Sequence, residues 1–344
     1  MALPISPPLV PMLARIQNDI PEGEGWLYEP KWDGFRAIVF RDNDDVDIIS
    51  RDKRPLERYF PELPPMLKDA LPERCVVDGE ILVARNGTLD FDALLQRIHP
   101  ATSRITKLST ETPASFVAFD LLALGDSDVR QEPLAIRRTR LESVLGPALD
   151  EKMPVMEDTG VYLTPQTPDR AEAEVWFDAF ESIGLEGLVA KQAGGPYVAG
   201  QRTMVKVKHV RSADVVIGGY RLGKSGDAVG ALLLGVYDSS GVLHYVGHTS
   251  SFKAKERREL LERLHSYEGD GGFGEGRSPG GLSRWSGGRE QTWVPLRPEL
   301  VCEVAFDKLQ GDRFRHAATF LRWRPDKPPL QCRFDQFEEQ SRHN

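Results

Sequence analysis

Short apolar runs alternate with charged turns along the front of the chain. Residues 26–30, 36–41 and 46–50 have the length and the β-branched or aromatic content of strands. The acidic stretch 42–45 between the last two predicts a hairpin turn, and residues 56–70 predict a helix interrupted by prolines. The front of the chain therefore predicts paired strands with helices between them.

The pattern continues in the same way to about residue 208. Residues 75–83 predict a strand that is broken at Gly79 and then returns. In residues 204–208 apolar and basic residues alternate, so Lys206 and Lys208 should face one side of a strand. The remaining expected elements are helices over 91–98, 133–147 and 168–183, the last capped by Thr167 or Asp169, and strands over 116–122 and 186–191.

The two ends of the chain differ from this middle part. Residues 1–24 contain five prolines and little periodicity, which predicts an extended arm. The rear half predicts a small barrel with one basic helix, 252–266, and a Gly-rich loop, 269–289. Its expected strands are 214–220, 229–237, 242–247, 292–295 and 300–307. The fold class that follows is α+β.

Length and composition fit a soluble globular protein. A chain of 344 residues predicts one large or two ordinary domains, and 40% hydrophobic with 28% charged residues is typical of globular chains. Because no apolar run approaches a membrane span, we expect a cytoplasmic protein with no membrane association. The three cysteines are scattered, which favours buried thiols over disulfides or a metal cluster.

Charge is distributed unevenly along the chain. The net charge is −8, but residues 1–200 carry −13 and residues 201–344 carry +5. An acidic front and a basic rear indicate two modules, of which the rear one suits a polyanion.

The candidate chemistry centres on Glu29 to Arg36, where a predicted turn at Asp33-Gly34 presents Lys31 among charged residues. An amine beside charged groups in a partly enclosed site can have a lowered pKa and attack an electrophile. A surface lysine beside a turn is the alternative. Glu80 and Glu186 lie on two separate apolar strands and can either hold a hydrated Mg²⁺ or be solvated strand ends. The chain has no Walker A sequence.

Seven short motifs occur in a fixed order, and together they indicate a family. The sequence resembles the ATP-dependent DNA ligases of the covalent nucleotidyltransferase superfamily, and within them the short bacterial LigC type. The motifs are Lys31-Trp32-Asp33-Gly34-Phe35-Arg36, Ser50-Arg51, Asp78-Gly79-Glu80, Phe119-Asp120, Glu186 to Lys191, Lys206-Val207-Lys208 and Arg324-Pro325-Asp326-Lys327. Two features depart from the family: Asp52-Lys53 follows Arg51 where Asn-Gly is usual, and Met204 stands where larger relatives have an aromatic residue.

The resemblance implies an activity. It implies that the Lys31 amine attacks the α-phosphate of ATP, that AMP then passes to the 5′-phosphate of a nick, and that the 3′-hydroxyl displaces AMP. It also implies Mg²⁺ or Mn²⁺ at Glu80 and Glu186. The residues implied to bind the nucleotide are Glu29, Arg36, Arg51, Glu80, Phe119, Arg202, Lys206, Lys208, Arg324 and Lys327.

The resemblance also implies the domain plan. Residues 1–209 would form the nucleotidyltransferase (adenylation) domain of antiparallel sheets and helices, and residues 210–344 an OB-fold barrel. Arg324 and Lys327 would meet the pyrophosphate, with a hinge near 209–214. The expected partner is nicked duplex DNA, bound by a monomer acting in DNA repair, with DNA-end-binding or polymerase proteins as further partners.

Three other interpretations stay open at this point. An RNA ligase or a capping guanylyltransferase shares the lysine, the carboxylates and the barrel, and nucleotide preference would separate the latter. A non-catalytic nick- or end-binding protein of the same fold is a second alternative, and an unrelated α+β protein is a third.

Overall fold

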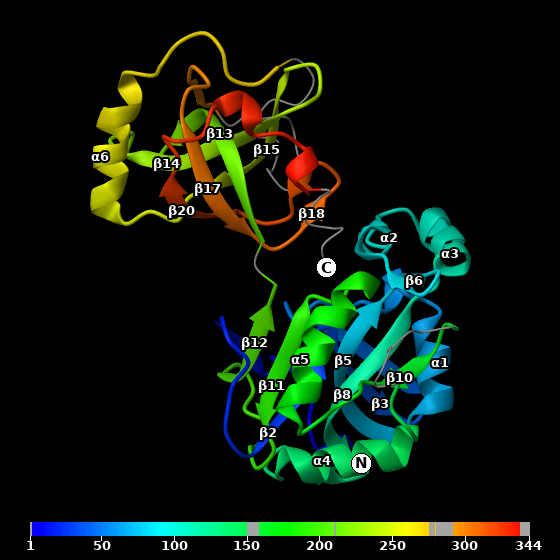
Figure 1. Ribbon diagram of the computed structural model, residues 1–344. Helices are drawn as coiled ribbons and strands as arrows, with labels where there is room; N and C mark the ends of the chain where they lie inside the picture. The colour runs from blue at the N-terminus through cyan, green and yellow to red at the C-terminus, as the bar shows by residue number, and fades with distance from the viewer. Residues whose placement is uncertain (1, 150–157, 210, 275–278, 280–291, 338–344) are drawn as a thin grey trace. The chain divides into compact units, whose positions relative to one another are not determined.

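The computed structural model describes residues 2–149, 158–209, 211–274, 279 and 292–337 (Figure 1). The chain divides into two compact units, residues 1–208 and 209–344, and each is described by itself. The expected α+β class is confirmed, because both units combine sheets and helices. No helix among the described residues is long and apolar enough to cross a membrane.

The first sheet of unit 1 has four strands in the order β1-β12-β11-β2. The strands are β1 Leu13–Gln17, β12 Arg202–Lys208, β11 Gly187–Gln192 and β2 Trp26–Pro30. Part of the extended arm expected over 1–24 is a strand of this sheet, since β1 pairs in parallel with β12. This strand carries no alternating signal, because it is an edge strand whose residues are all at least partly exposed.

The second sheet of unit 1 has the order β10-β8-β5-β3-β4, with β9 beside β8. Its core strand β5 runs unbroken from Arg74 to Leu82, so the predicted break at Gly79 is wrong. A Cβ at Gly79 would lie 2.3 Å from the Phe116 ring, so the glycine permits close approach of β8 and does not end the strand. The strands are β3 Phe35–Asp42, β4 Asp45–Ser50, β5 Arg74–Leu82, β8 Ser115–Leu124, β9 Ser127–Asp128 and β10 Val161–Leu163.

Helices cover the two sheets of unit 1. Figure 1 shows α4 along one end of the sheets and α5 against β11 and β2. The predicted cap Asp169 accepts a hydrogen bond from the Ala171 amide at the start of α5. The sequence pattern missed α3, in which only Ile105 is buried. The helices are α1 Leu63–Ala70, α2 Phe91–Gln96, α3 Thr102–Glu111, α4 Leu134–Leu145 and α5 Arg170–Ala179, with short 3-10 turns η1 Glu57–Tyr59 and η2 Phe180–Ile183 and a small hairpin, β6 Ala84–Arg85 with β7 Thr88–Leu89.

Unit 2 is built on one sheet in the order β15-β14-β13-β17-β20, with β16 beside β13. No closed barrel is found among the described strands. A single bridge between Thr249 and Ala318 joins the regions of the two edge strands. The elements are β13 Arg211–Leu222, β14 Val229–Tyr237, β15 Leu243–Thr249, α6 Ala254–His265, β16 Val294–Pro295, β17 Val301–Phe306, β18 Leu309–Gln310, β19 Arg313–Phe314, β20 Thr319–Trp323 and η3 Pro329–Gln331. Only part of the predicted loop 269–289 lies within the described residues.

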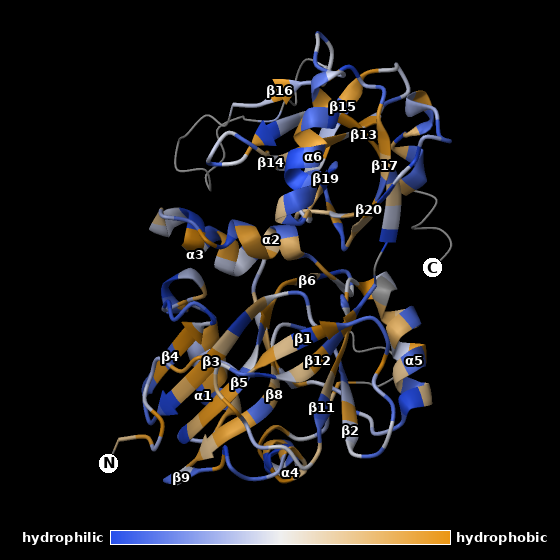
Figure 2. Ribbon diagram, turned by 90° about the vertical axis from the view of Figure 1, so that its left-hand side faces the viewer, coloured by the Kyte–Doolittle hydropathy of each residue, from blue (hydrophilic) through white to orange (hydrophobic). Residues whose placement is uncertain are grey.

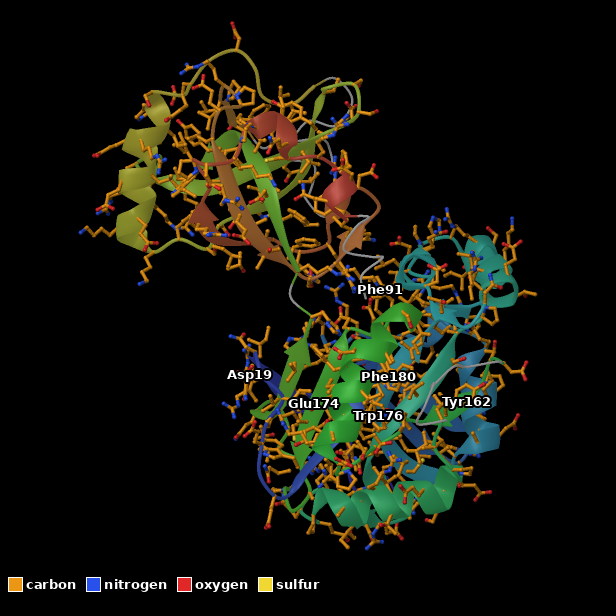
Figure 3. All side chains as sticks on the ribbon, viewed as in Figure 1. Asp19, Phe91, Tyr162, Glu174, Trp176 and Phe180 are labelled. Carbon is orange, nitrogen blue, oxygen red and sulfur yellow. The ribbon has the colours of Figure 1, made fainter. Side chains whose placement is uncertain are left out.

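Each unit has its own hydrophobic core, and Figure 2 shows apolar residues gathered on the strands. In unit 1, Trp176 and Phe180 stack with ring centroids 5.6 Å apart beneath the first sheet (Figure 3). Cys75, Cys302 and Cys332 are buried free thiols, as the sequence predicted.

Candidate active site

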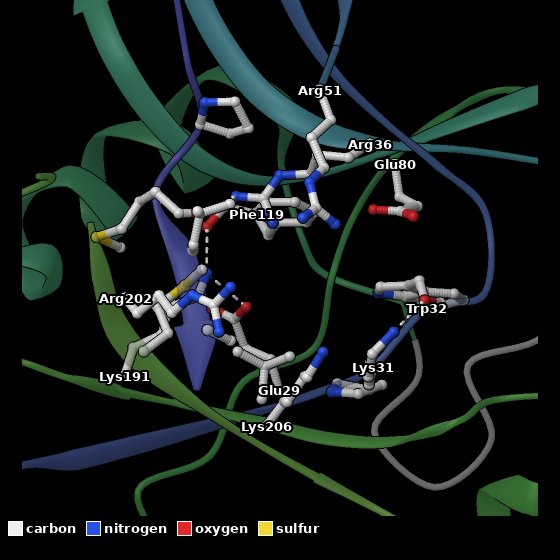
Figure 4. Close-up of a pocket in the computed structure, with 17 residues that line it drawn as sticks. Glu29, Lys31, Trp32, Arg36, Arg51, Glu80, Phe119, Lys191, Arg202 and Lys206 are labelled. Carbon is white, nitrogen blue, oxygen red and sulfur yellow. Dashed lines mark hydrogen bonds and ion pairs between the residues drawn. The ribbon is translucent and has the colours of Figure 1, made fainter. Parts of the chain in front are cut away.

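A polar cavity of about 220 Å³ lies in unit 1, lined by both sheets and by the segment before β1. Lys31 and Lys206 reach into it from one side, facing Arg36, Arg51 and Glu80 on the other (Figure 4). The predicted site residues that line it are Glu29, Lys31, Arg36, Arg51, Glu80, Phe119, Arg202 and Lys206. Lys208 and Glu186 are not in this lining, but Glu186 pairs with Lys31, and Lys208 pairs with Glu186.

Lys31 stands where the chain passes from the first sheet to the second. The turn at Asp33-Gly34 therefore joins two sheets, since β2 pairs with β11 while β3 pairs with β4 and β5. Backbone hydrogen bonds from the Lys31 amide to the Gly187 carbonyl and from the Glu186 amide to the Lys31 carbonyl fix this crossing. Gly34 is required because a Cβ there would lie 2.2 Å from the Ile81 carbonyl oxygen.

Glu186 holds two lysines at once. Its Oε2 lies 2.5 Å from Lys31 Nζ and 2.8 Å from Lys208 Nζ. Burial opposes ionisation of Glu186, but the two ammonium groups outweigh it and hold the pKa of its carboxyl below the usual range. Gly187, at φ +135°, lets the backbone pass close to the Val207 carbonyl. This carboxylate therefore fixes Lys31 beside Lys208.

Arg36 is fixed by a buried carboxylate from the next strand. Asp78 accepts hydrogen bonds of 2.7 and 2.6 Å from the Arg36 guanidinium, and one of 2.6 Å from the Tyr197 hydroxyl. The Tyr197 oxygen in turn accepts a 3.0 Å bond from the Met12 amide. The network links Arg36 to the segment that forms one wall of the cavity.

Phe119 and Glu29 form a second group at the cavity. The Glu29 carboxylate, 3% exposed, lies 2.7 Å from Lys191 Nζ and accepts a 2.6 Å hydrogen bond from Gln166. The Phe119 ring has two cations near its centroid, Arg36 Cζ at 4.4 Å and Lys191 Nζ at 4.7 Å. Phe119 is therefore a ring on the cavity surface that is held between basic groups, rather than an ordinary core residue.

Glu80 differs from the other acids of the site. It lines the cavity, and its carboxylate makes no hydrogen bond or ion pair with any other side chain that the structure describes. Burial raises its pKa to about 7, against the opposing effect of Lys31 and Arg36. Lys206 also has a lowered pKa, first through burial and then through the nearby ammonium groups of Lys208 and Lys31.

The predicted metal residues fit a cation unequally. The described residues contain no group of three or more His, Cys, Asp or Glu side chains that could hold a metal by themselves. Glu80 offers a free carboxylate to the cavity, whereas Glu186 already pairs with two lysines. Magnesium commonly uses one or two carboxylates together with substrate phosphates, so Glu80 fits such a site better than Glu186.

Arg324 and Lys327 lie in unit 2, where both converge on one acid. Asp214 Oδ1 is 2.8 Å from Arg324 Nη1, and its Oδ2 is 2.7 Å from Lys327 Nζ. Arg324 also pairs with the exposed Asp326 at 2.8 Å. The structure thus brings together the two cations of the last motif.

The sequence analysis assigned no role to several residues that lie at the site or hold its side chains. Trp32 lines the cavity with its indole N–H 2.9 Å from Thr164 Oγ1, and Lys191 contacts both Glu29 and Phe119. Lys191 ends a recognised motif, so that motif was a signal for it. Asp78 also belongs to a recognised motif, whereas Tyr197 and Gln166 act through partners far away in the sequence and gave no such signal.

Comparison with known proteins agrees with this geometry. Residues 11–208 match the family "ATP dependent DNA ligase domain", and residues 225–327 match "ATP dependent DNA ligase C terminal region". DNA ligase C1 of Mycolicibacterium smegmatis is 48% identical, and DNA ligase C of Mycobacterium tuberculosis is 47% identical. Each match covers 98% of this chain and 96% of the relative.

A solved structure titled as an analysis of Lig E DNA ligases covers 92% of this chain and all of its own, at a TM-score of 0.53 and 19% identity, which is a likeness of fold. The relatives of nearly equal length carry the assignment. The chain belongs to the ATP-dependent DNA ligases, enzymes that form phosphodiester bonds in DNA.

Proposed function

We propose that this enzyme seals nicks in duplex DNA and that Lys31 is the residue that carries AMP. One observation supports this most: the Lys31 side chain is 20% exposed and reaches into a polar cavity lined by arginines and lysines. Two other lysines line the same cavity. Lys191 is buried against Glu29, and Lys206 lies within β12 and not in the turn between the sheets.

The chemistry requires a neutral amine. Lys31 loses a proton to solvent, and its nitrogen forms a bond to the α-phosphorus of ATP while the bond to the bridging oxygen breaks and pyrophosphate leaves. The bonded nitrogen then loses a second proton to solvent, which gives the neutral N–H of the phosphoramide. The depressed pKa of Glu186 makes its carboxylate a poor proton acceptor at neutral pH, so its proposed role is to orient the lysine and not to act as the base. AMP then passes to the 5′-phosphate of the nick, and the 3′-hydroxyl displaces it.

The other side chains have proposed roles around this step. Phe119 stacks on the adenine and the Glu29 backbone contacts its edge, while Arg36, Arg51 and Arg202 contact the sugar and phosphates. Lys206 and Lys208 hold the α-phosphate. These roles are the ones that the family resemblance implies, and they are supported by the lining of the cavity and by the pairing of Lys208 with Glu186.

A divalent cation, Mg²⁺ or Mn²⁺, would be held by Glu80 together with the substrate phosphates, with Glu186 close to Lys31 as the second acid. Such a cation supplies positive charge that offsets the charge of the phosphates and of the leaving pyrophosphate. The free carboxylate of Glu80 is the observation that favours it.

Residues 1–209 are proposed as the adenylation domain and residues 210–344 as the DNA-binding OB-type domain. The hinge is proposed near residue 209, because Arg211 to Asp214, the rest of the expected hinge, are paired with β17 as part of β13. The net charge of +5 over residues 201–344 favours contacts with the phosphates of nicked DNA, so binding should weaken steeply with salt. We also propose a modest affinity for nicks by the protein alone and a role in repair, with recruitment by DNA-end-binding or polymerase partners.

A duplex with a single 5′-phosphate nick tests the proposal. The wild-type enzyme should seal it with ATP and Mg²⁺ and should not seal the same duplex with a 5′-hydroxyl. Lys31→Ala should abolish sealing, whereas Lys107→Ala, at an exposed lysine of α3, should not change it. Efficient sealing of a nicked RNA duplex only, or use of GTP in place of ATP, would favour the RNA ligase or guanylyltransferase alternatives. Sealing by Lys31→Ala at the wild-type rate would refute the role of Lys31.

A further inference from the structure

Asp214 binds both cations of the last motif with one carboxylate. Arg324 Nη1 contacts Oδ1 at 2.8 Å and Oδ2 at 3.0 Å, and Lys327 Nζ contacts Oδ2 at 2.7 Å. The side chain of Asp214 is 12% exposed, so these charges are less screened by water than a surface pair. Because both cations touch Oδ2, they lie within about 6 Å of each other.

Asp214 is itself held rigidly. It lies in β13 opposite Glu303 of β17, and the Gln336 side chain bonds both its backbone amide and its backbone carbonyl, at 3.0 and 3.2 Å. The Arg324 amide bonds the Val301 carbonyl at 2.9 Å. Two other segments of unit 2, β17 and the segment of Gln336, therefore fix the carboxylate and one of its two partners.

Asp214 is the one described carboxylate that contacts both cations. Asp326 pairs with Arg324 as well, so the four side chains together carry no net charge, and what Asp214 supplies is the spacing of the two cations. Without the carboxylate, two like charges about 6 Å apart would repel each other and their long side chains would separate. Asp326 is no substitute, because it is 63% exposed and its described contacts reach Arg324 only.

We propose that Asp214 is a positioning residue for the adenylation step, which sets Arg324 and Lys327 at the separation needed to bind the pyrophosphate of ATP. This inference rests on the proposed role of those two cations. It assigns to Asp214 no contact with substrate. Its effect should therefore appear where pyrophosphate is bound or released, and not where the nick is closed.

The test is Asp214→Asn in the full-length enzyme, measured in three reactions. Adenylation with ATP, and its reversal by inorganic pyrophosphate, should each slow at least tenfold, while sealing of a pre-adenylated nick should stay within twofold of wild type. Glu303→Gln is the matched control. It neutralises the acid that lies opposite Asp214 in the sheet, and this acid, Glu303, pairs with Arg322. It should leave all three reactions unchanged.

Three results would overturn the proposal: unchanged adenylation in Asp214→Asn, faster adenylation, or an equal loss in all three reactions, which would indicate a folding role. Thermal unfolding of each variant identifies a loss of folding directly. Arg324→Ala and Lys327→Ala in the same reactions separate the two hypotheses. If they adenylate normally, the proposed role of the cations fails; if they are slow while Asp214→Asn is normal, only the role of Asp214 fails.

Discussion

Asp120 belongs to a recognised motif next to Phe119, yet the structure gives it a structural role. Successive residues of a strand face opposite sides, so Phe119 lies at the cavity and Asp120 points away from it. Its carboxylate accepts bonds of 2.7 and 2.9 Å from Arg137, and the pair is almost fully buried, with side-chain exposures of 1% and 0%. Arg137 also donates to the Glu132 and Gly195 carbonyls.

Asp120→Asn should therefore lower the free energy of unfolding by about 3 kcal/mol, because removing one partner of a buried ion pair leaves the other charge uncompensated. Breaking a buried ion pair usually costs about 3–5 kcal/mol, and the lower value applies here because asparagine keeps one acceptor oxygen for Arg137. With a denaturant slope of about 3 kcal/mol per M, the urea midpoint of the full-length protein should fall by roughly 1 M. Adenylation by the folded variant, measured at low temperature, should stay within about threefold of wild type.

Asp128→Asn is the matched control. Asp128 pairs with Arg130 in the same bidentate way, but both side chains are about one-third exposed, so the loss should be below about 1 kcal/mol. The reasoning would be refuted if Asp120→Asn unfolded at the wild-type urea concentration and had lost adenylation, since Asp120 would then act in catalysis and not in folding.

Three further predictions concern the cavity. Glu80 has a pKa of about 7 in the folded protein against an ordinary 4.5, so the folded state binds more protons and stability falls as pH rises between these values. The stability gained by Glu80→Gln should thus be larger at pH 8 than at pH 5, and equal gains in urea unfolding would contradict it. Gly34→Ala should lower the free energy of unfolding by about 1–3 kcal/mol in the same assay, because the added Cβ would lie 2.2 Å from the Ile81 carbonyl oxygen. Gly194→Ala, where the Cβ enters open space, should leave it nearly unchanged, and equal effects of the two substitutions would contradict the packing argument. Tyr197→Phe should lose about 1–3 kcal/mol and raise the KM for ATP through Arg36, and an unchanged KM would show that the hydroxyl does not position that arginine.

The sequence predicted the residues of the cavity better than the way they are held. Lys31, Glu80 and Phe119 follow from short motifs, because each motif places one functional side chain on one strand or turn. The partner of Arg36 is 42 residues away, and Tyr197 is 119 residues from the same carboxylate. Local patterns carry no information on such pairings, which arise only when the strands assemble into a sheet.

The same limit explains the errors in the fold. Residues 13–17 show no strand pattern because their pairing with β12 is an edge contact 189 or more positions away along the chain. Glycine weakens a strand, which predicts the break at Gly79, but here the residue makes room for the Phe116 ring of the neighbouring strand. In the rear half the expected small barrel is found as one sheet whose edge regions are joined by a single bridge, and no closed barrel is found among the described strands.

The central claim is that the amine of Lys31 becomes covalently bound to AMP. The most direct measurement is mass spectrometry of peptides from wild-type enzyme incubated with ATP and Mg²⁺, with Lys31→Ala beside it. The account predicts one peptide heavier by one AMP, with the added group on Lys31, and no such peptide from the variant. AMP on Lys191 or Lys206, or no adduct from folded enzyme shown to be free of bound AMP at the start, would contradict it.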